Sequence, residues 1–71
     1  MTRSEAARSI EWEISIYSIG ITVIASGPSH GRSVWMRRFF HDHEVDAPPA
    51  DAWDILKAMQ DALIDRMLAH G

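Results

Sequence analysis

The chain has 71 residues, seven basic against ten acidic side chains, a formal charge of -3 and no cysteine. A chain of this length forms one domain with a small core. Its excess of acidic side chains argues against a general binder of nucleic acid or anionic membrane. Its lack of cysteine excludes disulfides and thiolate metal sites. Hydrophobic residues make up 46% of the sequence, which excludes a disordered chain. We see no apolar run of signal-peptide or membrane-span length, so we expect a cytoplasmic protein without a membrane anchor.

The first residues are small and polar, and we expect residues 1–8 to be a flexible lead-in to a single domain over residues 9–71. From Ile10 onward the sequence alternates strictly between apolar and mostly polar side chains, which predicts a half-buried strand. The expected core face carries Ile10, Trp12, Ile14 and Ile16, and the other face carries Glu11, Glu13, Ser15 and Tyr17.

A second strand is expected over residues 21–26, joined to the first by a tight hairpin in which Gly20 adopts a positive φ. If the numbers of facing residues add up to an odd value, the apolar face of one strand meets the apolar face of the other. An even sum would set Ser15 and Glu13 against the apolar residues. We therefore expect the odd sum, which pairs Ile14 and Ile16 with Val23, Ile21 or Ala25, and leaves Ile24 beside Glu13 or Ser15 on the outer face.

Residues 27–33 contain two glycines and a proline, which predicts a turn or loop. A third strand is expected over residues 33–41, although both of its faces carry large side chains. We expect Val34, Met36 and Phe40 to face the core. The outer face of the sheet then collects Tyr17, Ile24, Trp35, Arg37 and Phe39, which is unusually apolar for a solvated sheet.

Apolar residues recur at helical spacing over residues 51–70. The apolar arc covers about half of the helix, wider than the ~100° that one neighbouring layer requires, so we expect a second apolar neighbour besides the sheet. Pro48 and Pro49 suit a first turn, Asp46 or Asp51 can cap it, and Gly71 ends the helix. The arc consists of Ala52, Trp53, Ile55, Leu56, Met59, Leu63, Ile64 and Met67, with Leu68 at its edge, opposite Asp54, Lys57, Asp61 and Asp65.

The predicted architecture is α+β, a three-stranded antiparallel meander (β-β-β-α) with one C-terminal helix packed across it. The surplus apolar surface predicts a homodimer. No motif for catalysis or for a cofactor occurs, so we expect a non-enzymatic module whose outer-face residues bind a larger protein as an inhibitor or adaptor that occludes a surface. In its small size, its acidic charge and its lack of recognisable motifs, the chain resembles the small inhibitors and adaptors encoded by phages and other mobile elements, anti-CRISPR proteins among them. This resemblance does not rest on any residue motif.

Two alternatives come from other classes of protein. Arg32, Arg37 and Arg38 lie among aromatic residues, as in a β-ribbon that binds nucleic acid, but the acidic total favours a protein partner. His41 and His43 would point to one side of a strand and could support a metal-dependent activity, with His30 or His70 completing the site. Histidines in an acidic loop are more often solvated, so we assign no metal site.

Overall fold

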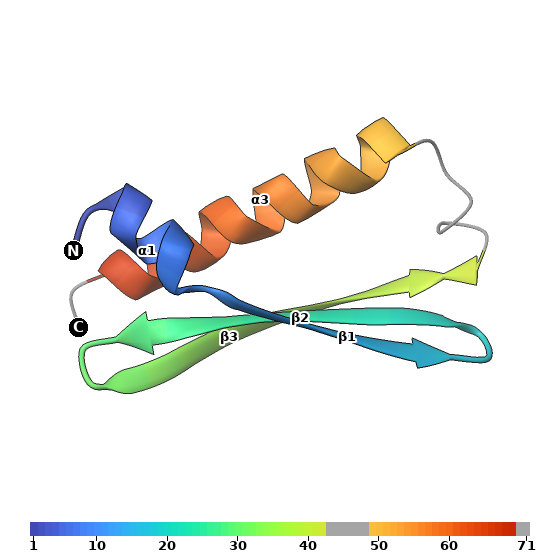
Figure 1. The fold of residues 1–71 in the computed structure, drawn as a ribbon, viewed down its shortest axis with the longest axis horizontal. Helices are drawn as coiled ribbons and strands as arrows, with labels where there is room; N and C mark the ends of the chain where they lie inside the picture. The colour runs from blue at the N-terminus through green and yellow to red at the C-terminus, as the bar shows by residue number, and fades with distance from the viewer. Residues whose placement is uncertain (43–48, 70–71) are drawn as a thin grey trace.

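The computed structural model describes residues 1–42 and 49–69, with the backbone alone for residues 49–52. An antiparallel sheet in the order β1-β2-β3 lies beneath one long C-terminal helix, α3, and a short helix, α1, precedes the first strand (Figure 1). The predicted α+β meander is confirmed. The elements are α1 Arg3–Ser9, β1 Glu11–Tyr17, β2 Gly20–Ser29, β3 Arg32–His41 and α3 Pro49–Leu68. No helix in the described ranges is long and apolar enough to cross a membrane.

The N-terminal segment corrects our expectation of a flexible lead-in over residues 1–8, because it forms the helix α1. Thr2 caps this helix by accepting a hydrogen bond from the Glu5 N–H at 3.1 Å, and the Thr2 N–H donates to the Glu5 carboxylate at 3.1 Å. This reciprocal pair is a capping box, which satisfies two otherwise unpaired donors. The hydrogen bond from the Thr2 backbone N–H lowers the pKa of the Glu5 carboxyl, and the Thr2 side chain lowers it further.

Packing against α3 holds α1 in place, since a helix of seven residues is not stable alone. Ala6 is fully buried, and Ile10 at the end of the helix joins the same core cluster. Arg3 donates to the Asp65 carboxylate of α3 at 2.6 Å. Both of these charged side chains are more than half exposed, so the ion pair contributes at most about 1 kcal/mol. The apolar contact is therefore the main attachment.

The first hairpin has the predicted register, with Ile14 opposite Val23 and Glu13 opposite Ile24, so the facing numbers add up to an odd value. The turn consists of residues 18 and 19. Gly20 does not adopt the positive φ that we expected. A side chain at Gly20 would overlap the backbone carbonyl oxygen of Phe40 on β3, so close approach of the neighbouring strand requires glycine there.

The second hairpin corrects our expectation of a loop over residues 27–33, because β2 continues to Ser29 and β3 begins at Arg32. The turn is only His30 and Gly31, with φ values of 51° and 80°. Two successive positive φ angles are typical of the tight turn that suits the twist of a hairpin. Pro28 fits within β2 because the pairing of β1 with β2 stops at Ser26, two residues before the proline. A backbone N–H at position 28 would point to this unpaired side of β2, so the proline costs no hydrogen bond of the sheet.

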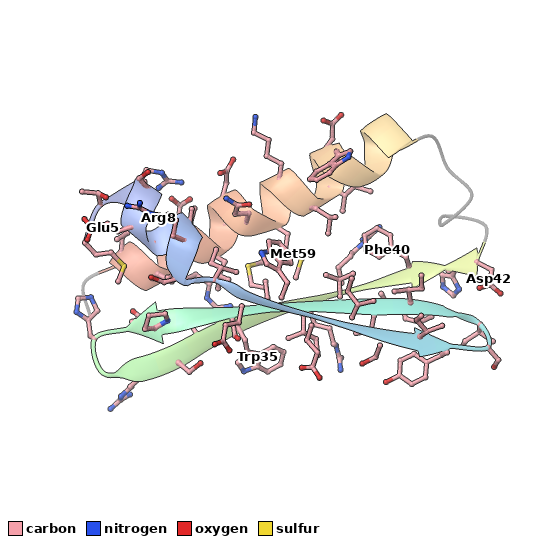
Figure 2. The ribbon with its side chains drawn as sticks, in the orientation of Figure 1. Glu5, Arg8, Trp35, Phe40, Asp42 and Met59 are labelled. Atoms are coloured by element: carbon pink, nitrogen blue, oxygen red, sulfur yellow. The ribbon has the colours of Figure 1, made fainter. Side chains whose placement is uncertain are left out.

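The core lies between the C-terminal half of α3, helix α1 and the middle of the sheet (Figure 1). The helix packs on β2 and β3, which fits its width of about 10 Å, since strands lie about 4.8 Å apart. Figure 2 shows Met59 and Phe40 on the side where the helix and sheet face each other. The buried cluster consists of Ala6, Ile10, Ala25, Met59, Leu63, Ile64 and Met67, with Val34 and Met36 packed against it as predicted.

The second hairpin also binds the C-terminal end of α3. The Ser29 hydroxyl donates to the Met67 carbonyl oxygen at 3.0 Å, and the His30 ring Nε2 lies 2.9 Å from the Ala69 carbonyl oxygen, to which it donates. These bonds satisfy carbonyl groups that a helix end leaves unpaired. The predicted roles of Asp46, Pro48 and Gly71 lie outside the described residues, and Asp51 lies inside the helix instead of capping it.

Candidate protein-interaction surface

The five residues predicted to bind a partner share one face of the sheet, the side away from α3, which we call the outer face. Figure 2 shows Trp35 projecting from this side. The cross-strand rows place Ile24 directly beside Arg37, with Trp35 and Phe39 two residues before and after it on β3. Tyr17 also lies on this face, but on β1 and about 20 Å from Trp35 along the strands. The compact part of the predicted site is therefore Ile24, Trp35, Arg37 and Phe39.

Exposure differs among these side chains. Trp35 is 57% exposed, and Tyr17 and Arg37 are exposed as well, whereas Ile24 and Phe39 are half-buried. Phe39 is less exposed because its ring lies over the bare backbone of Gly20 and packs edge-on against the His41 ring at 4.9 Å. Part of Phe39 therefore serves the fold, and Trp35 is the most available apolar anchor of the outer face.

Trp35 also lies at the free edge of β3, where α3 contributes a contact. Arg66 donates from Nη1 to the Trp35 carbonyl oxygen at 3.2 Å. The same arginine helps to line a shallow hollow of about 560 Å³ beside Trp35 and Arg37. The neighbourhood of Trp35 thus combines an exposed aromatic ring, two guanidinium groups and a concave surface, which are features of protein-binding hot spots.

A second apolar surface was not predicted as exposed. The helix-facing side of β1 carries Trp12, Ile14 and Ile16, which we expected in the core. The strand and its register are as predicted, yet Ile14 is 65% and Ile16 80% exposed. The cause is geometric, because α3 packs on β2 and β3 and leaves β1 uncovered. We call the three residues the β1 apolar row.

The β1 apolar row borders an open groove of about 600 Å³ beneath the first half of α3. Trp53 of the helix, expected in the apolar arc, is 72% exposed at its rim. Leu56 lies in the groove and is half-buried. The wide arc of the helix thus has a covered part, around Leu63, and an open part. The groove is lined by Trp12, Ile14, Val23, Trp53, Asp54, Leu56, Lys57 and Gln60.

The arginines of the nucleic-acid alternative do not meet on one surface. Arg37 lies on the outer face, whereas Arg38 lies on the opposite face and stacks over the Phe40 ring, with its guanidinium carbon 5.2 Å from the ring centre. Arg32 is the first residue of β3, next to the turn and five residues before Arg37. A sheet that binds nucleic acid presents its basic and aromatic side chains together, and this arrangement separates them.

The histidines of the metal alternative lie only partly in the described residues. His43 and His70 lie outside the described ranges. His41 ends β3, and His30 lies in the turn before it, so the strand separates them by about 30 Å. His30 therefore cannot complete a site at His41. Within the described residues, no three histidine or acidic side chains gather where they could hold a metal ion.

Comparison with known proteins adds no family to this description. No protein-family model, no curated protein and no solved structure matches the chain.

Proposed function

We propose that the chain is a non-enzymatic protein-interaction module that works as a homodimer and occludes a surface of a larger protein, as an inhibitor or adaptor. One observation carries the proposal: large apolar side chains are exposed on both faces of the sheet, Trp35 and Tyr17 on one and the β1 apolar row on the other. Exposed apolar surface of this extent marks interaction sites. The cysteine-free sequence is compatible with a reducing compartment, and we place the module in the cytoplasm.

The outer face is the proposed site for the larger protein. Trp35 and Arg37 lie two positions apart on β3, so they project to the same side about 7 Å apart. Tryptophan and arginine are the residues most enriched among interface anchors, because each covers a large area and offers directed hydrogen bonds or charge. Small phage and mobile-element inhibitors, which the chain resembles in format, are the class of protein we propose for it.

Trp35→Ala tests this surface. We expect the variant to bind the larger protein more weakly by about 2 kcal/mol, roughly thirtyfold in dissociation constant. Its melting temperature should remain unchanged, because the ring is exposed. The partner is first captured from host lysate with the tagged chain and identified by mass spectrometry, and its affinity for each variant is then measured by calorimetry with purified proteins.

Ile19→Ala is the control, since Ile19 is also an exposed apolar side chain but lies in the turn of the first hairpin, away from Trp35 and outside the β1 apolar row. The control should retain the affinity for the partner. If Ile19→Ala weakens the complex and Trp35→Ala does not, the surface around Trp35 is not the binding surface. If Trp35→Ala lowers thermal stability and affinity together, Trp35 belongs to the fold and the proposed site is wrong.

A further inference from the structure

The free edge of β1 has an unusual combination of features. Tyr17 and Gly20 close a two-residue turn, so each donates its backbone N–H to the carbonyl oxygen of the other. The same exchange recurs at every second pair along the two strands, which involves Ser15, Glu13 and Glu11 of β1. Trp12, Ile14 and Ile16 therefore direct their N–H and C=O groups away from β2, toward the open side. In the part of the chain that the structure describes, no side chain donates to or accepts from this edge. The residues with open backbone groups are the β1 apolar row itself.

We infer that β1 pairs with β1 of a second copy, antiparallel and with Ile14 opposite Ile14, so that two sheets join into one of six strands. The inference rests on the homodimer of the proposed function and names its interface. An open edge strand readily accepts another strand. Antiparallel pairing about a twofold axis at Ile14 uses the open groups of all three row residues, because Trp12 of each copy then lies opposite Ile16 of the other.

Charge selects this register among those that keep the two apolar rows on the same face. With Ile14 on the axis, Glu13 lies opposite Ser15 and Glu11 opposite Tyr17, so no two carboxylates face each other. Moving the axis to residue 13 sets Glu13 against Glu13, and moving it to residue 12 sets Glu11 against Glu13. Like charges directly opposite each other on neighbouring strands are destabilising. Moving the axis to residue 15 avoids this repulsion but pairs only two of the three row residues.

The same pairing supplies a neighbour for the open groove. Trp12 lines the groove, and Ile16 of the second copy would lie directly beside Trp12 on the same face. The side chains of Ile14 from both copies would meet on the axis. The uncovered half of the apolar helix arc, with Trp53 and Leu56, thereby gains the second apolar neighbour that its width predicts. The outer face, with Trp35 and Arg37, stays free for the larger protein.

Sedimentation velocity of the full chain at tens of micromolar tests for the dimer, and Ile14→Asp tests the interface. Two aspartates opposite each other at the axis should raise the dissociation constant of the dimer at least about 100-fold. Ile19→Asp is the control, because Ile19 lies in the turn beyond the paired residues and is 64% exposed, almost as much as Ile14. This control should remain a dimer, and circular dichroism should show both variants folded.

Single cysteines report the register, because the natural chain has none. Facing residues of the type Glu13 and Ser15 have Cα atoms about 4.5 Å apart, within the range of a disulfide. An equimolar mixture of Glu13→Cys and Ser15→Cys, oxidised gently, should form the mixed disulfide beyond its statistical share, as measured by intact mass. An excess of disulfides between two Glu13→Cys chains would place the axis at residue 13, and an excess between two Ser15→Cys chains would place it at residue 15. Either result overturns the inference.

The outcomes separate this inference from the proposed function. The β1 interface is wrong if the natural chain is a dimer, the Ile14→Asp variant is still a dimer, and the cysteine variants form no excess of the mixed disulfide. The proposed homodimer would remain in that case. A monomeric natural chain overturns both the interface and the proposed homodimer, and leaves the β1 edge open to a strand of the larger protein. Loss of the dimer in Ile14→Asp, retention in Ile19→Asp and the mixed disulfide together support the inference.

Discussion

Replacing Leu63 with alanine tests the hydrophobic core most directly. Leu63 is 0% exposed and lies in the cluster formed by α1, α3 and the sheet. The substitution removes about three buried carbon groups, at about 0.8 kcal/mol each, so the loss is about 2.4 kcal/mol if the surroundings collapse onto the site. It approaches 5 kcal/mol if a cavity remains. A domain of this size has only about 3–5 kcal/mol of stability, so the variant should be partly unfolded.

Urea unfolding followed by tryptophan fluorescence measures the loss, at one fixed protein concentration because dimerisation adds to apparent stability. Leu56→Ala is the matched control: Leu56 is half-buried at the open groove, so the same deletion should cost about 1 kcal/mol. Leu63→Met keeps the volume and should cost less than about 1.5 kcal/mol, which preserves a measurable transition. A loss under about 1 kcal/mol for Leu63→Ala would refute the assignment of this helix face to the core.

Two further predictions concern the sheet. Gly20→Ala should lower the free energy of unfolding by about 3 kcal/mol, because the added methyl group overlaps the backbone carbonyl of Phe40. Gly27→Ala should lower it by only about 1 kcal/mol, because the added methyl group meets the flexible end of Met67. Equal losses of the two variants in urea unfolding would contradict this difference. The chain should form no complex with DNA or RNA at physiological salt, since Arg37 and Arg38 project from opposite faces. Anisotropy of labelled oligonucleotides checks this, and a submicromolar complex that weakens by about one logarithmic unit per contact as salt rises would favour the nucleic-acid alternative.

The parts of the fold that were predicted correctly depend on side-chain periodicity. Strict alternation located β1, and the requirement that apolar faces meet selected the register in which Ile14 lies opposite Val23. Helical spacing over residues 51–70 located α3 to within two residues at each end. The same spacing identified Leu63 and Met67 as core residues, and both are buried.

The parts that were missed depend on single residues or on the placement of whole elements. The signal for α1 was the pair Thr2 and Glu5 at capping-box spacing, which is easily overlooked in a segment without an apolar stripe. Pro28 suggested a loop because its tolerance within β2 depends on where β1 ends, which no local pattern shows. Exposure of the β1 apolar row had no sequence signal, because alternation tells which face is apolar and not whether a single helix is wide enough to cover it.

The hydrogen bond from Arg66 to the Trp35 carbonyl oxygen makes the two edges of the sheet unequal. A sheet that is open on both sides can add copies without limit and grow into a fibre. Here a helix side chain occupies an acceptor at the β3 edge, and the bulky ring and charge of Trp35 and Arg37 project beside it. In the dimer that we infer, pairing at β1 would occupy the edge that has no such contact in the described part of the chain, so assembly would stop at two copies. Removing the Arg66 side chain would thus matter less for folding than for keeping this protein from polymerising.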